Sequence, residues 1–272
     1  MDVAVAARLR FWPMSPAPEH AADLARAQFG AVAETYVTSA YHASGPDLQA
    51  LVQAARPVAT DDVLDLGCGA GHTALAIAPH VAYVTAVDVT PDMLTAAAKL
   101  AEQRGVANVT FQLADATRLP FDSDRFDLVT SRVAAHHFAD PRAALAEVRR
   151  VLRPGGRLAL VDTVSPEEAP LDTFLQCVEL LRDASHARDW RVSEWLRMLS
   201  ASGFEDPDVV DRFTLQLNGD EWVKRMRTPA AKVAMIRQLL AEASSAQQRA
   251  FDIRTGDDWG FTLDLALLRA TR

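Results

Sequence analysis

Cysteine is scarce in this chain, and long apolar runs and clusters of basic residues are missing from it. Its 272 residues contain two cysteines, Cys68 and Cys177, which excludes a disulfide framework and a CxxC metal pair. No apolar stretch approaches the roughly 20 residues of a membrane-spanning helix. The N-terminus lacks the apolar core of a secretory signal, because Asp2 comes early and Arg8 follows soon after. We therefore expect a cytoplasmic protein that does not insert into a membrane.

The balance of charge is acidic, with a formal net charge of −8 at pH 7. Basic residues form no cluster longer than the pairs Arg149-Arg150 and Lys224-Arg225. Nucleic acid is therefore not expected as a partner, because phosphate contacts need a basic surface. No group of His, Asp and Glu residues has the spacing of a metal site, so we expect a metal-independent protein. The sequence gives no indication of an oligomeric state.

Short, strongly apolar runs alternate with helical segments between about residues 60 and 162. The expected strands are Val63–Leu66, Tyr83–Asp88, Val109–Leu113, Phe126–Ser131 and Arg157–Asp162. The expected helices between them are His72–Ala78, Pro91–Arg104 and Pro141–Leu152. This alternation is typical of an α/β protein in which a mostly parallel sheet carries helices on both faces.

Segments of different character flank this pattern. Residues 1–45 are expected to form an N-terminal arm, loose over Met1–Pro18, and a lid segment with a helix at Ala21–Val32. Residues 46–165 are expected to form the core domain, which starts with a helix at Pro46–Arg56. Residues 166–272 are expected to supply helices at Leu171–Arg182 and Val192–Ser202, a strand near Asp208–Phe213, a helical insertion from Asp220 to about Gln247 and a last strand at Thr262–Ala270.

The segment Asp65-Leu66-Gly67-Cys68-Gly69-Ala70-Gly71 follows the first core strand directly and leads into a helix. Glycine lets the backbone turn sharply and approach a ligand without a Cβ in the way. The third glycine, Gly71, comes one residue earlier than in the dinucleotide fingerprint G-x-G-x-x-G. Asp65 would repel a pyrophosphate but suits a cationic ligand, and S-adenosylmethionine (SAM) carries an ammonium and a sulfonium group. The loop therefore favours SAM over NAD, with contacts from Asp65, Gly67, Cys68, Gly69 and Gly71.

Two further acids follow the next two strands. Asp88 ends the second strand about twenty residues beyond the glycines, where a carboxylate can accept hydrogen bonds from both ribose hydroxyls. Val89 and Met93 are expected to cover the adenine, although a buried core methionine fits position 93 equally well. Asp115 comes just after the third strand and is expected to accept a hydrogen bond from the adenine amino group, while the Ala116 N–H contacts a ring nitrogen.

Five motifs follow one another in order along the core: residues 63–72, Val87-Asp88, Ala114-Asp115-Ala116, residues 126–131 and residues 152–157. As a set they resemble the motifs of the class I SAM-dependent methyltransferases. The similarity is strongest to the ubiquinone- and menaquinone-biosynthesis type and to the YcgJ-like bacterial group, and for the latter it extends to residues 134–138, 181–186 and 193–195.

This resemblance implies a fold and a reaction. The fold is a Rossmann-like, seven-stranded, mostly parallel sheet with one reversed strand, which we assign to Thr262–Ala270, and a helical lid. The reaction is in-line displacement of the SAM methyl group onto a small molecule, which leaves S-adenosylhomocysteine as the product.

The segment after the fourth strand is expected to face the substrate, because ligands of open α/β sheets bind at the carboxyl ends of the strands. His137 or His136 is the candidate base there, since histidine can take a proton near neutral pH. Adjacent residues cannot point the same way in a regular element, so at most one of the two is expected to face the methyl group. Ser131 is a candidate contact to the cofactor, and Arg132, Arg182 and His186 are candidate contacts to the substrate.

Aromatic residues outside the core are the remaining candidates. Tyr36 is expected to fold over the cofactor, together with Tyr41 and His42. Trp190, Trp195, Trp222 and Phe251 favour an apolar or aromatic acceptor, although packing of the lid on the core explains them as well. Two other functions stay open. One is a SAM-binding protein of this fold without methyl transfer, and the other is an NAD-linked oxidoreductase, which would need a G-x-G-x-x-G loop.

Overall fold

The computed structural model describes residues 8–10 and 19–272, and a nine-stranded sheet forms its centre. The strand order is β1-β4-β3-β2-β5-β6-β9-β8, and β7 pairs with β6 beside this path. Every pairing is parallel except those of β9 with β6 and with β8, so β9 is the reversed strand. The strands are β1 (Arg8–Arg10), β2 (Asp62–Leu66), β3 (Tyr83–Asp88), β4 (Val109–Leu113), β5 (Phe126–Arg132), β6 (Leu152–Ser165), β7 (Trp190–Arg191), β8 (Glu205–Asn218) and β9 (Gly260–Thr271).

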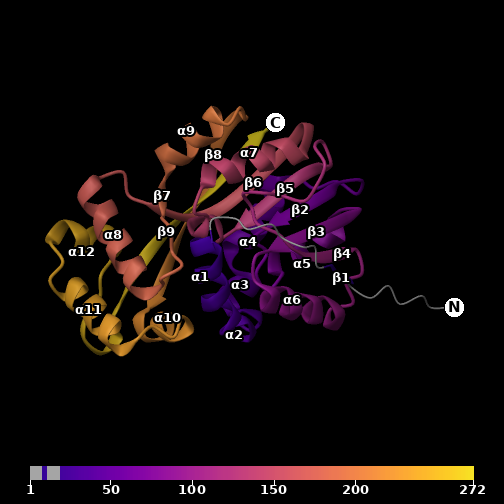
Figure 1. The fold of residues 1–272 in the computed structure, drawn as a ribbon. Helices are drawn as coiled ribbons and strands as arrows, with labels where there is room; N and C mark the ends of the chain where they lie inside the picture. Colours follow the sequence, from indigo (N-terminus) through magenta and orange to yellow (C-terminus); the bar gives the residue numbers. More distant parts are fainter. Residues whose placement is uncertain (1–7, 11–18) are drawn as a thin grey trace.

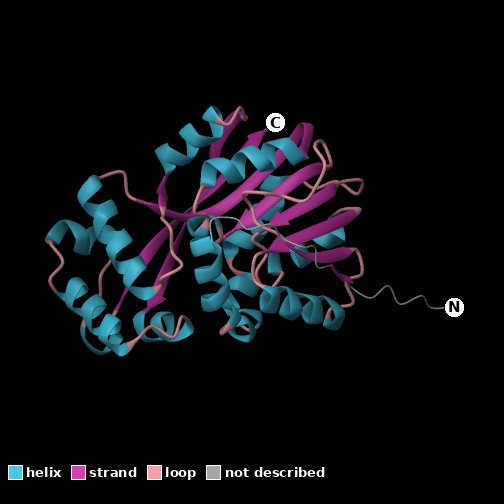
Figure 2. Cartoon of the chain, viewed as in Figure 1, coloured by secondary structure: helices cyan, strands magenta, loops and turns pink. Residues whose placement is uncertain are grey.

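Helices cover both faces of this sheet, and Figure 2 shows the sheet as the middle layer. The helices are α1 (Glu19–Gly30), α2 (Ala33–Val37), α3 (Ala40–Ser44), α4 (Pro46–Ala55), α5 (His72–Ile77), α6 (Pro91–Gln103), α7 (Pro141–Val151), α8 (Ala169–Arg182), α9 (Val192–Ala201), α10 (Gly219–Arg225), α11 (Ala230–Ala241) and α12 (Ser245–Phe251). Among them, α8, α10, α11 and α12 gather at one end of the molecule (Figure 1). None of the helices in the described part of the chain is long and apolar enough to cross a membrane.

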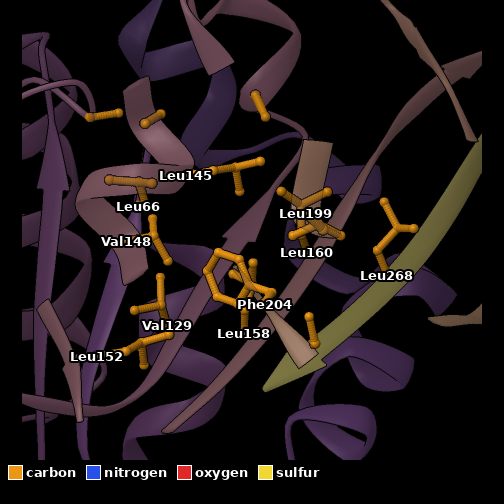
Figure 3. Packing of buried hydrophobic residues seen from close by; sticks show 14 of the residues in the cluster. Leu66, Val129, Leu145, Val148, Leu152, Leu158, Leu160, Leu199, Phe204 and Leu268 are labelled. Atoms are coloured by element: carbon orange, nitrogen blue, oxygen red, sulfur yellow. The ribbon is translucent and has the colours of Figure 1, made fainter. Parts of the chain in front are cut away.

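Two apolar clusters hold the helices to the two faces of the sheet. On one face, α7 and α9 pack on the strands through residues such as Leu145, Val148 and Leu199 (Figure 3). On the other face, α5 and α6 bury residues such as Leu94 against β3 and β4, while α4 buries Leu51 and packs on β6 and β9. Apolar side chains on both faces of a strand leave it buried on both sides, which is why the core strands are near-continuous apolar runs.

A separate apolar cluster joins α8, α10, α11 and α12 to the ends of β8 and β9. Leu175, Trp222, Ile236 and Phe261 are buried in this cluster. It lies apart from the two clusters that hold the core helices. The helical insertion is therefore anchored to the sheet by its own core and stands beside the carboxyl end of β6.

The expected α/β class, the parallel sheet and the reversed strand are confirmed, while the strand number is nine rather than seven. One extra strand is β7, a two-residue pairing with β6. The other is β1, which lies inside the arm expected to be loose and pairs with β4, because an edge strand has unpaired backbone groups to offer. The rest of Met1–Pro18 lies outside the described residues. The strand expected at Arg157–Asp162 is longer, since β6 already begins at Leu152.

Candidate active site

A cavity of about 400 Å³ lies where β2, β3, β4 and β5 end. These strands are parallel, so their carboxyl ends meet at one edge of the sheet and the loops that follow them share the cavity. The loops contribute residues 66–70, 72 and 73 after β2, 87–90 after β3, 114–117 after β4, and 132–134 with 137–140 after β5. We call this space the first cavity.

The glycine-rich loop after β2 passes along the first cavity with positive φ angles. At Gly67 (φ +67°) a Cβ would lie 2.6 Å from the Cβ of Ala134, so a side chain does not fit there. At Gly69 (φ +49°) a Cβ would meet no atom within 4 Å, and Gly69 lines the cavity. Gly71 instead packs toward α6 and β4 and is not part of the cavity wall. The backbone around Gly69 is thus left open to a ligand.

Asp88 stands beside this loop at the end of β3. Its two carboxylate oxygens accept hydrogen bonds from the backbone N–H groups of Gly69 (2.8 Å) and Thr90 (2.9 Å). Burial raises the pKa of Asp88, and these two N–H groups oppose the rise because they stabilise the charged form. Each carboxylate oxygen has a second lone pair, so Asp88 can also accept hydrogen bonds from a ligand.

The loop after β4 contributes Asp115 and Ala116 to the cavity wall. Both were predicted to belong to the same site as Asp88. Oδ1 of Asp115 accepts hydrogen bonds from the N–H (2.8 Å) and the hydroxyl (2.7 Å) of Thr117, which fixes the carboxylate at the cavity edge. Val89 and Met93 line the same cavity, and Met93 is only 2% exposed. The residues expected around the adenosyl group therefore do surround one space.

Asp65 and Ser131 were expected to contact the cofactor, but neither lines the first cavity. Asp65 is buried beneath the loop, where its Oδ1 accepts a hydrogen bond from the Thr130 hydroxyl (2.8 Å). Burial raises the pKa of Asp65 to about 7. The Ser131 hydroxyl donates to the carbonyl of Leu66 (2.9 Å). Both side chains thus hold β2 and β5 together under the loop instead of facing a ligand.

A second cavity, of about 80 Å³, adjoins the first. Five residues line both spaces and form what we call the junction: Phe29, Tyr36, His42, Val133 and His137. Aromatic rings meet there, because the rings of Phe29 and His137 contact edge to face with centroids 4.8 Å apart. The second cavity also has charged residues on its walls, among them His136, Glu179, Arg182 and Arg225.

His137 lies at the junction as a neutral imidazole. Its Nδ1 lies 3.1 Å from the carbonyl oxygen of Ser185, and a carbonyl only accepts, so Nδ1 carries the proton. The other ring nitrogen, Nε2, then has a free lone pair and forms no hydrogen bond within the described part of the chain. Burial and the neighbouring charge of His136 lower the pKa of His137 to about 4.

His136 was the other candidate base, and its surroundings argue against that role. Its Nδ1 lies 2.6 Å from Oδ1 of Asp162, and its backbone N–H donates to Oδ2 of the same carboxylate (2.7 Å). Burial alone would lower the pKa of His136, but the Asp162 carboxylate outweighs it and raises the pKa to about 9. His136 is therefore an imidazolium at neutral pH and has no lone pair to offer. It lines the second cavity only.

Known proteins share both the sequence and the fold of this chain. Residues 64–160 match the model of a family described as a methyltransferase domain. The chain is 40% identical over 247 residues to the uncharacterized methyltransferase YcgJ of Bacillus subtilis, covering 90% of this chain and 97% of YcgJ. The YcgJ crystal structure superposes with a TM-score of 0.80 at 39% identity, over 83% of this chain and 97% of YcgJ. A putative methyltransferase from Bacillus halodurans gives a TM-score of 0.80 at 36% identity, over 84% of this chain and 99% of the other. The chain belongs to the class I SAM-dependent methyltransferases, in the group of YcgJ.

The first cavity of this methyltransferase fits SAM, the methyl donor of the family. A volume of about 400 Å³ is typical of a cofactor pocket, and most of its lining is apolar. The open space at Gly69 admits a ligand close to the backbone, and Asp88 supplies a carboxylate at the next strand end. The loop lacks the third glycine position that a dinucleotide pyrophosphate would need.

Arg132 was expected to contact the substrate, but its guanidinium is engaged by the protein. Its Nε and one terminal nitrogen donate to the two oxygens of Asp47 at 2.6 Å and 3.1 Å. The terminal nitrogens also donate to the carbonyls of His42 and Tyr41. Only 3% of the Arg132 side chain is exposed, although its edge lines the first cavity. In the methyltransferase this arginine therefore fastens α3 and α4 to β5.

The other two predicted substrate contacts lie in different places. Arg182 lines the second cavity, packs over the ring of Trp222 and lies 3.7 Å from Glu179. His186 lines neither cavity, because it is buried against Gln176 with its Nε2 3.2 Å from the amide oxygen. Burial lowers the pKa of His186. Arg182 therefore remains a candidate contact to the substrate, whereas His186 does not.

Several residues that line the first cavity were not predicted from the sequence, and the most prominent is Phe29 of α1. Ala25, from the same helix, lines this cavity with it. The aromatic character of the segment around Tyr36 is visible in the sequence, but the sequence does not show which residues of α1 face the cavity. Of the aromatic residues expected to form the roof, Trp222 lines the second cavity, while Trp190, Trp195 and Phe251 line neither.

Proposed function

We propose that this methyltransferase transfers the methyl group of SAM, held in the first cavity, to a small molecule whose reacting atom lies at the junction. The observation that carries the proposal is the position of His137, which lines both cavities and presents a neutral imidazole between them. The rings of Phe29 and Tyr36 lie with this ring at the junction of the two cavities.

The cofactor contacts follow from the order of the strand ends. Asp88 would accept hydrogen bonds from the ribose hydroxyls, and Asp115 with the Ala116 N–H would bind the adenine edge. Val89 and Met93 would cover the adenine ring, and the loop of Gly67, Cys68 and Gly69 would hold the methionine part. The cofactor supplies a sulfonium methyl group, whose bond to sulfur breaks with the electron pair left on sulfur as the bond to the acceptor atom forms. Tyr36 closes the space from the side of α2.

The protein contributes mainly alignment, because a sulfonium is already a good leaving group. His137 Nε2 can accept a hydrogen bond from an O–H or N–H of the acceptor and so direct a lone pair of that atom toward the methyl group. The positive charge of His136 disfavours a second positive charge next to it. We therefore expect His137 to accept a hydrogen bond from the acceptor without becoming protonated. The proton released by the acceptor is then taken up by solvent.

The walls of the junction favour an acceptor with an apolar or aromatic body. The ring of Phe29 lies 5.7 Å from that of Tyr36 and 4.8 Å from that of His137, with edge-to-face geometry in both pairs. Aromatic rings packed in this way offer apolar surface to a flat ligand. A SAM-binding protein of the same fold without methyl transfer is the alternative, and it would need no aligned acceptor.

Isotopically methyl-labelled SAM tests the proposal. The protein is incubated with labelled SAM and a panel of phenols, quinones, amines and carboxylates, and label in the acceptor is measured. For an acceptor that takes up label, we expect His137→Gln to lower kcat about 10- to 100-fold while SAM binding is kept. His80→Gln, at an exposed position, serves as the matched control. SAM binding without transfer to any acceptor would favour the non-methylating alternative, and full activity of His137→Gln would remove His137 from the mechanism.

A further inference from the structure

Arg225 presents an unpartnered positive charge to the second cavity. It is the last residue of α10 and one of the residues that line this cavity. Its guanidinium forms neither a hydrogen bond nor an ion pair with any residue that the structure describes. Burial and the nearby charge of Arg182 lower the pKa of Arg225, which is the direction expected for a cation without a partner.

The neighbouring guanidinium of Arg182 is differently placed, because the protein already engages it. Its Nε donates to the carbonyl of Trp222 (3.3 Å), and a terminal nitrogen lies 3.7 Å from Glu179. Arg182 therefore needs no further partner. Its positive charge still repels that of Arg225. An anion placed between Arg225 and the cavity wall would relieve this repulsion.

Three acids also border the second cavity, and none of these described residues forms an ion pair with Arg225, although the charge of Glu179 opposes part of the fall in its pKa. Glu179 lies beside Arg182, and burial raises its pKa to about 7, so it is partly protonated near neutral pH. Oδ1 of Asp183 accepts hydrogen bonds from Ser185, and Oδ1 of Asp189 accepts one from Thr163. The remaining oxygens of Asp183 and Asp189 accept no hydrogen bond in the described part of the chain and are sealed from solvent, and Oδ2 of Asp189 lies 3.8 Å from Nε2 of His186. The positive group that a ligand can reach and that still lacks a partner is thus Arg225.

We propose that the second cavity is a subsite for a carboxylate group of the methyl acceptor, with Arg225 as the residue that binds it. A guanidinium offers parallel N–H donors that match the two oxygens of a carboxylate. The proposal rests on the proposed function, since it assumes that the acceptor enters the junction from this side. The acceptor class is then a small carboxylic acid with an apolar or aromatic body, whose carboxylate lies in the second cavity and whose reacting atom is a different one at the junction.

The volume of about 80 Å³ supports a small head group. A carboxylate fits a space of this size, while the larger body of the molecule has to lie at the junction among Phe29, Tyr36 and His137. Inorganic phosphate shares the negative charge but is not planar, so it serves as a comparison.

Binding to the protein saturated with S-adenosylhomocysteine tests the subsite without requiring turnover. Isothermal titration is carried out with benzoate, phenylacetate and 3-phenylpropionate, with their neutral amides, and with inorganic phosphate. We expect at least one carboxylate to bind ten times or more tightly than its amide, as a charge-assisted hydrogen bond predicts. Arg225→Gln should reduce this ratio to about one, and Arg225→Lys should keep part of it. Lys224→Gln removes the same charge from the exposed side of the same helix and should leave the ratio unchanged.

Several outcomes would overturn the subsite. They are the absence of saturable binding for every carboxylate, equal binding of acids and amides, tighter binding of phosphate than of any carboxylate, and a ratio that survives Arg225→Gln. Binding of S-adenosylhomocysteine is measured for each variant and reports that the fold and the first cavity are intact. The proposed methyl transfer is tested separately with labelled SAM, and it would be contradicted if no acceptor took up label. Failure of the subsite and failure of the proposed function can therefore be told apart.

Discussion

The imidazole rings of His136 and His137 lie with their centroids 4.1 Å apart, and one is charged while the other is neutral. Asp162 holds the proton on His136, and the resulting charge together with burial keeps His137 unprotonated. Two adjacent residues of the same type thus have different chemical capacities. The carboxylate of Asp162, rather than the histidines themselves, decides which ring can accept a hydrogen bond from a substrate.

Asp162→Asn is expected to bring the two histidines closer in charge. Without the carboxylate, burial dominates, so the pKa of His136 falls from about 9 to below its ordinary value, while that of His137 rises. Titration of the imidazole C–H resonances by NMR measures both values. Asp122→Asn, at an exposed position, is the control and should move neither. A His136 that keeps its high pKa in Asp162→Asn would show that another group holds its proton.

The same substitution makes a prediction for stability against pH. Because the folded pKa of His136 lies above its unfolded value near 6.5, the ion pair contributes its full stability below pH 6.5 and loses it as the pH rises to about 9. The wild-type protein should therefore be more stable than Asp162→Asn by about 2–3 kcal/mol at pH 6, with the difference shrinking toward pH 9. Urea unfolding across this range measures it. A difference that is constant with pH would contradict the assignment.

Asp88→Ala is expected to weaken SAM binding about tenfold or more, which corresponds to about 1.4 kcal/mol. The substitution removes the proposed ribose contact and also the acceptor for the N–H groups of Gly69 and Thr90. Asp88→Asn keeps one acceptor oxygen and should lose less. Equilibrium binding of SAM gives the affinities, with Asp122→Ala as the exposed control. An unchanged affinity in folded Asp88→Ala would remove Asp88 from the cofactor site.

Asp47→Ala is expected to lower the free energy of unfolding by about 3–5 kcal/mol, because it leaves the buried guanidinium of Arg132 without its counter-charge. The double variant Asp47→Ala with Arg132→Met removes both charges and should recover part of the loss. Chemical denaturation of the three proteins provides the values. If the single variant lost less than about 1 kcal/mol, the pair would not fasten the N-terminal helices as the structure indicates.

Chelation is expected to leave methyl transfer intact. The described part of the chain contains no group of three or more His, Cys, Asp or Glu side chains arranged to hold a metal ion. Activity with labelled SAM is compared before and after treatment with EDTA. Loss of activity that Mg²⁺ or Zn²⁺ restores would show that a metal takes part after all.

The sequence by itself placed Asp88 and Asp115 on the wall of the first cavity. The strands and the loop of Gly67 and Gly69 are local patterns, and Asp88 and Asp115 directly follow strands that the sequence identifies. Because parallel strands bring their carboxyl ends to one edge, residues at these positions have to share a site wherever the rest of the chain goes. Their proximity therefore followed from strand order alone.

Tertiary structure decided the acceptor side, where a residue's role depends on neighbours that are distant in sequence. His136 owes its charge to Asp162, 26 residues further on, and Arg132 is occupied by Asp47, 85 residues earlier. Asp65 fits a ligand-binding pattern but is buried under the loop by Thr130 of the adjacent strand. Arg225 lies in the helical insertion, which carries no motif. Burial and pairing of such groups arise only from packing, so no local pattern predicts them.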